Sequence, residues 1–178
     1  MVEVEAPASP RRRSLSHTLG GGAVAGVFGG LVIELLLLAR SAALHGDLWR
    51  SLKFGAYPFL GARAIAPGFD AGPVVLGLAC HLGVSAVWGM LFALLAFGMS
   101  RLATVAAGAI WGVVVWAVMY HVVLPLVGAG RVVKGAPVGG AILEHVVFGL
   151  AVAVGFLPFQ REQGEHVRPR RRRATSMR

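Results

Sequence analysis

The sequence predicts an all-α integral membrane protein, a bundle of four transmembrane helices. Of its 178 residues, 56% are hydrophobic and only 14% are charged, whereas a soluble globular domain carries roughly 25% charged residues. Four apolar segments are long enough for a helix to cross the hydrocarbon core, which takes about 20 residues. This hydrophobicity also excludes a disordered chain, and the length indicates one domain.

The first element is a polar tail, and apolar spans follow it. The predicted spans cover residues 19–38, 73–99, 102–126 and 137–159. Residues 1–18 and 160–178 are Arg-rich tails without apolar periodicity, and we expect both to be disordered. Only Ser100 and Arg101 join the second and third spans. We therefore predict a tight antiparallel hairpin there.

The first span has an alternative interpretation as a signal peptide, because Arg12 and Arg13 precede it. Its apolar run is longer than an ordinary signal core of about 7–15 residues. It also contains Glu34, ends in Arg40, and lacks a clean small-residue cleavage site. We therefore predict an uncleaved first helix.

The positive charge lies mainly outside the apolar body. The net charge is +9, and 10 of the 17 Lys and Arg residues lie in the two tails. Nucleic-acid binding is not expected, because it needs basic residues on a folded face. Basic residues beside spans instead set topology and contact anionic lipid head groups. With both termini cytoplasmic, that side holds 11 basic residues against six on the other. The bias predicts an N-in, C-in protein of the bacterial inner membrane.

The loop over residues 40–72 is too long for a simple turn. It mixes apolar residues such as Leu44, Trp49 and Phe54 with Asp47 and Lys53. This pattern predicts a short amphipathic helix on the outer surface, with Trp49 at the level of the lipid head groups. A plain connecting loop is the alternative.

Each span carries small residues spaced four apart. Such stripes let helices approach closely, which matters because lipid provides no hydrophobic drive for association. We expect them to face the bundle interior, together with one polar residue in each row. The glycines concerned are Gly22, Gly26, Gly30, Gly77, Gly89, Gly108, Gly112 and Gly149.

Five ionisable residues interrupt the spans, and all of them fall in the outer half of the bilayer. Such residues are costly inside a membrane and mark functional sites by default. His81 and His145 each follow a proline by eight residues, roughly 12 Å along the helix. Ser85 lies one turn from His81 in the same row. The predicted site comprises Glu34, His81, Ser85, His121, Glu144 and His145.

Several chemistries fit this cluster. Histidine titrates near neutrality, so the groups can pass protons or act as a pH-sensitive latch. His81, His121 and His145 are candidate ligands for zinc, copper or iron. His81 and His145 also suit the axial positions of a b-type haem. No tight His-x-x-x-His spacing and no C-x-x-C-H motif is present, so no cofactor is firmly implied. The remaining interpretation is interhelical hydrogen bonding that only stabilises the bundle.

No enzyme signature is found. The sequence lacks a G-x-S-x-G elbow, a P-loop and a zinc-protease motif, and the single Cys80 reads as a small buried hydrophobe. We expect a non-catalytic membrane protein whose outer-half site senses or binds a proton, a metal ion or a small ligand. The alternatives are a metal- or haem-dependent redox protein using the same histidines, and a structural or assembly protein that forms homo-oligomers through its glycine stripes.

Some of these residues also carry a family resemblance. The third span has the pattern Gly108-x3-Gly112-x12-Pro125-x2-Gly128, the second carries His81 followed by small residues, and Glu144-His145 opens the fourth. Over roughly residues 19–157 the chain resembles small bacterial inner-membrane proteins of the YagU-like kind and related families of unknown function. The spacing from His121 to Pro125 departs from that pattern. The resemblance implies a multi-pass inner-membrane protein and no particular activity.

Overall fold

The computed structural model describes residues 15–134 and 137–164, and within them all regular structure is helical. Four helices there are long and apolar enough to cross a membrane. The four are α1 (Leu15–His45), α4 (Ala71–Leu95), the helix that starts as α5 (Arg101–Val118), and α8 (Val138–Gly164). The third continues through a π-helical turn, η2 (Met119–Val123), into α6 (Leu124–Leu126). The predicted all-α membrane bundle is confirmed.

The helix bounds differ from the predicted spans where polar groups find partners. Helix α1 continues past Arg40, whose side chain pairs with Glu144. Helix α8 continues beyond the predicted boundary at residue 159, and Gln160, placed in the tail by the sequence, is buried. Helix α4 ends at Leu95, ahead of a turn in which Gly98 has a φ of 79°. Most of the two predicted tails lies outside the described residues.

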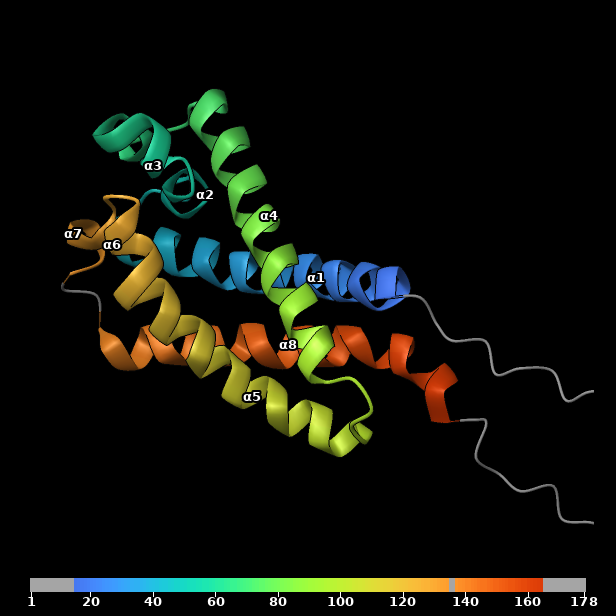
Figure 1. The fold of residues 1–178 in the computed structure, drawn as a ribbon. Coiled ribbons are helices and arrows are strands. Elements are labelled where there is room, and N and C mark those ends of the chain that lie inside the picture. The colour runs from blue at the N-terminus through green and yellow to red at the C-terminus, as the bar shows by residue number, and fades with distance from the viewer. Residues whose placement is uncertain (1–14, 135–136, 165–178) are drawn as a thin grey trace, which may run out of the picture.

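Short helices join the spans at one end of the bundle, opposite the start of α1 and the end of α8 (Figure 1). We call this the distal end. It holds α2 (Arg50–Phe54), α3 (Tyr57–Leu60), the 3-10 turn η1 (Gly61–Ile65) and α7 (Gly130–Val133). The start of α1 and the end of α8 lie together at the other, proximal end (Figure 1).

The spanning helices are ordered α4, α1, α8, α5. Antiparallel helices α1 and α8 pack against each other, α4 packs on α1, and α5 packs on α8 (Figure 1). The predicted tight hairpin of the second and third spans is wrong, because α4 and α5 diverge from the turn that joins them. Large rings lie between them, with the Trp88 and Trp111 centroids 5.6 Å apart and Phe92 beside Trp111. These side chains hold α4 and α5 apart while the glycines bring each onto its central helix.

The two halves of the chain are built alike. Gly22 and Gly26 of α1 meet the α4 backbone at Gly89 and Ser85. In the same manner, Gly108 and Gly112 of α5 meet the α8 backbone at Gly149 and His145. The sequence Gly-Ala-Val-Ala-Gly-Val at 22–27 returns as Gly-Ala-Ile-Trp-Gly-Val at 108–113. The bundle is thus two helix pairs of matching register, α1–α4 and α5–α8.

Polar groups close the proximal end of the bundle. Ser100 caps α5, its Oγ accepting from the Ala103 N–H at 3.3 Å. The Gln160 amide donates to the Ala96 carbonyl at 3.1 Å and to the Thr104 hydroxyl at 2.9 Å. Thr104 is fully buried and also bonds the Ser100 carbonyl. This network ties α8 to the ends of α4 and α5.

The loop predicted to hold one amphipathic helix contains α2, α3 and η1, folded against α4. Gly55 packs on the Gly77 carbonyl, and Gly77 on Leu52, so Gly77 faces this loop instead of a spanning helix. Lys53, predicted on the polar face, is 1% exposed and donates to the carbonyls of Ala66 and Gly68. A buried ammonium surrounded by acceptors holds the loop against the bundle.

Candidate functional site

The candidate site begins where the glycine row of α1 reaches its polar member. Gly22, Gly26 and Gly30 face α4, and Glu34 is the next residue of the same row. A methyl group at Gly26 would collide with the Ser85 carbonyl, so the two backbones are in direct contact there. Because the helices lie this close, the Glu34 side chain between them is only 5% exposed.

His81 on α4 reaches across to α1. Its Nε2 lies 3.0 Å from the Gly30 carbonyl oxygen and 3.7 Å from Oε2 of Glu34. Gly30 has no side chain to block the imidazole. The Ser85 side chain packs directly against Gly30, where an added methyl group would collide with it. The structure therefore brings together three residues that the sequence singled out separately: Glu34, His81 and Ser85.

One oxygen of Glu34 has no hydrogen-bond partner among the described residues. This atom, Oε1, is fully buried. Leaving a buried polar atom unpaired costs roughly 1–3 kcal/mol, and more for a charged group. The carboxyl group thus presents an unused acceptor inside the bundle, next to an imidazole.

Glu144 belongs to a different contact. Its Oε1 lies 2.9 Å from Nη1 of Arg40, which joins α8 to α1. The sequence treated Arg40 as an outer-loop charge and did not place it in the site. The pair is partly exposed, with side-chain exposures of 38% for Arg40 and 16% for Glu144. Arg40 is therefore engaged by one carboxylate and does not pair with Glu34.

His145 lies against α5 and bonds within its own helix. Its Nδ1 is 2.8 Å from the Ala141 carbonyl oxygen, and its ring meets the edge of Tyr120 with centroids 5.8 Å apart. Tyr120 therefore lies beside this polar layer.

His121 stands apart from the other two histidines. It is exposed, and its ring meets Trp116 at a centroid distance of 5.5 Å. Across residues 15–134 and 137–164, no three His, Cys, Asp or Glu side chains are placed to hold a metal ion together. The proposed set of His81, His121 and His145 is thus not gathered into one centre. With Nε2 at the Gly30 carbonyl, His81 keeps only Nδ1 for a haem iron or any other ligand.

A comparison with protein-family models, curated proteins and solved structures returns no match for this chain. Its function is therefore argued from the site itself.

Proposed function

We propose that this chain is a small multi-pass protein of the bacterial inner membrane whose Glu34–His81 pair binds and releases a proton. Both termini are placed in the cytoplasm, on the charge distribution, so the pair lies in the outer half of the bilayer. The observation that carries the proposal is Oε1 of Glu34, buried and unpartnered among the described residues. A proton is the smallest ligand that this oxygen can bind.

The physical argument rests on desolvation. The Glu34 side chain, 6% exposed between two membrane helices, has lost most of its water, and the His81 ring lies 3.7 Å from its carboxyl group. Binding a proton removes the charge that the low-dielectric surroundings disfavour. Releasing it makes a carboxylate that His81 can neutralise when the imidazole is charged.

Comparison with the α5–α8 pair supports a role for Glu34 other than helix packing. Counted from the matching glycines, Tyr120 of η2 stands where Glu34 stands in α1, and Ala141 of α8 stands where His81 stands in α4. The α5–α8 pair packs as closely with neither a carboxylate nor a histidine at these positions. Helix packing therefore does not require the Glu34–His81 pair.

The charged and titratable groups around the pair define its electrostatics. His81 faces Glu34 from α4. The Arg40–Glu144 ion pair bridges α1 and α8 nearer the distal end. Since Arg40 is held by Glu144, a Glu144 variant changes the surroundings of the site without removing the proposed proton acceptor.

Infrared difference spectroscopy of the full chain in liposomes tests this proposal. Between alkaline and acidic buffer, we expect the carbonyl stretch of a newly protonated carboxyl group, shifted in heavy water. The band should disappear in Glu34→Gln, which keeps the size and one acceptor oxygen. It should persist in the matched control Glu144→Gln.

His81→Ala is a second variant that tests the same site in the same experiment. Because the imidazole lies 3.7 Å from the carboxylate, its removal should change the frequency of the Glu34 band or the pH at which it forms. A carboxyl band that is unchanged in Glu34→Gln, with helicity intact by circular dichroism, would refute the proposal.

A further inference from the structure

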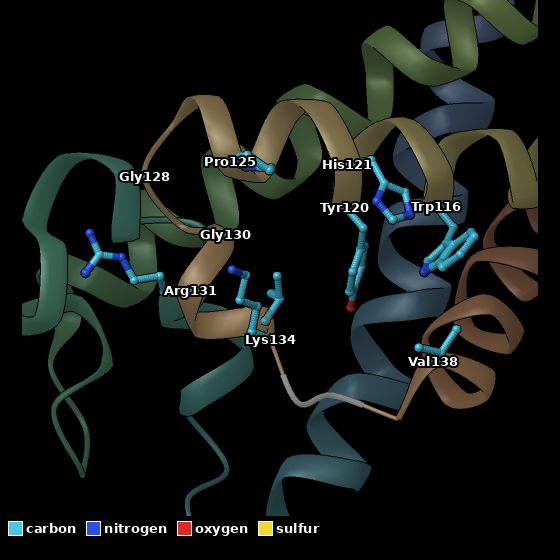
Figure 2. A pocket seen from close by; sticks show the side chains of 10 residues that line it. Trp116, Tyr120, His121, Pro125, Gly128, Gly130, Arg131, Lys134 and Val138 are labelled. Carbon is cyan, nitrogen blue, oxygen red and sulfur yellow. The ribbon is translucent and has the colours of Figure 1, made fainter.

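A cavity opens at the distal end of the bundle, away from Glu34 and His81. It lies between the π-helical turn that ends the third span, α7 and the start of α8, and encloses about 670 Å³ (Figure 2). Trp116, Tyr120, His121 and Pro125 line it from the third span. A cavity of this size accommodates a small molecule or a head group.

The lining carries positive charge and donors. Arg131 and Lys134 approach the cavity from α7 and its end, and none of its ten lining residues is Asp or Glu. Within the described part of the chain neither cation forms an ion pair. Tyr120 and His121 add polar groups on the opposite wall (Figure 2). An anion suits this lining, since two cations and no carboxylate border it.

A π-helical turn forms the wall that the third span contributes. The widened π-helical turn begins three residues after Trp116 and contains Tyr120 and His121, and such turns occur frequently at functional sites.

Exposed apolar side chains continue from the cavity along the third span. Val122 is 48% exposed and Leu126 is 80% exposed. On a membrane helix these side chains contact acyl chains. A ligand with an anionic head and apolar chains therefore fits both the cavity and the surface beside it.

We propose that this cavity binds a phosphate-bearing anion, with the head group of an anionic phospholipid as its source. The phosphate accepts from Arg131 and Lys134, and the acyl chains lie along Val122 and Leu126. This site is independent of the Arg-rich tails and of proton binding at Glu34.

Native mass spectrometry of the full chain in neutral detergent tests the proposal, with phosphatidylglycerol as the probe and phosphatidylcholine as the uncharged comparison. Lipids bound by the tails are common to all variants, so the cavity is read as one additional phosphatidylglycerol. The double variant Arg131→Gln, Lys134→Gln should weaken that step about 25-fold, or about fivefold for each charge. Arg63→Gln, an exposed arginine of η1 outside the cavity, is the matched control and should bind as the wild type does.

Inorganic phosphate, added alone, separates the two sources: competition that depends on Arg131 and Lys134 supports the anion site and identifies free phosphate as a ligand. Equal phosphatidylglycerol binding by the wild type, the double variant and Arg63→Gln would overturn the proposal, as would equal binding of phosphatidylcholine at the same step.

Discussion

Replacing Gly26 by alanine is the most direct test of the helix contact that buries Glu34. The added methyl group would collide with the Ser85 carbonyl and lie 2.9 Å from the Ala86 Cα, where ordinary contact begins at 3.4 Å. Both obstacles are backbone atoms, so α1 and α4 must separate by at least about 0.5 Å. Overpacking of this kind typically costs about 1–3 kcal/mol.

Separation of the helices has a second cost. The His81–Gly30 hydrogen bond, 3.0 Å long, lies one turn along α1 from the substituted position and weakens as the helices part. Interhelical hydrogen bonds in membranes contribute about 0.6 kcal/mol on average. We therefore expect Gly26→Ala to unfold with a free energy about 1.5–3.5 kcal/mol lower than an alanine variant of the same helix that meets no neighbour.

Equilibrium unfolding in mixed micelles, followed by circular dichroism, measures this difference. Gly20→Ala is the matched control in the same helix, because nothing lies within 4 Å of its added methyl. Alanine is about 1 kcal/mol better than glycine in a helix, so the control should be neutral or stabilising. Gly112→Ala, at the matching position against the His145 carbonyl, should behave like Gly26→Ala. If Gly26→Ala is as stable as Gly20→Ala, the close contact of α1 and α4 is refuted.

Two further predictions concern the ends of the bundle. Thr104→Val and Gln160→Leu should show a coupling of about 0.6–1.7 kcal/mol in a double-mutant cycle of unfolding, since their side chains bond at 2.9 Å; strictly additive effects would contradict this network. Lys53→Met should leave the carbonyls of Ala66 and Gly68 without their donor and destabilise the distal loop by about 1–3 kcal/mol. Faster proteolysis within residues 46–70, with the spans intact, is the expected result, and unchanged cleavage would show that the lysine does not hold the loop.

Local sequence signals were sufficient for the helices but not for their partners. Hydropathy and length located the four spans, because an apolar run long enough to cross a bilayer must satisfy its backbone within a helix. The chain connection between residues 95 and 101 suggested that the second and third spans pair. The bulky side chains of Trp88 and Trp111 lie between α4 and α5 and keep these helices from packing closely. The length of the connecting loop does not indicate this.

The sequence identified the residues of the candidate site, but it did not show which of them contact one another. Glu34 stood out because a carboxylate inside a span is rare, and the same rule singled out His81, His121, Glu144 and His145. Residues at a similar depth in the membrane were then expected to lie close to one another. The structure separates His121 from the rest, because it lies exposed on the π-helical turn and lines the distal cavity.

Two partners were missed for a related reason. Arg40 was counted as a topology charge, although its long side chain reaches Glu144 on α8. Gln160 was placed in a tail, although the helix that contains it continues beyond the apolar run. The repeat of Gly-Ala-Val/Ile-x-Gly-Val at 22–27 and 108–113 was the available signal for the two matching helix pairs.

The sequence by itself determined the environment, the number of spans and the small-residue rows, because each follows from the composition of a single segment. The tertiary structure alone decided which rows face one another. Rows of small residues occur on all four helices and are compatible with several pairings, so the choice depends on how backbones and large side chains fit in three dimensions. That fit places Glu34 beside His81 and Arg40 beside Glu144, and it leaves Oε1 of Glu34 unpartnered among the described residues.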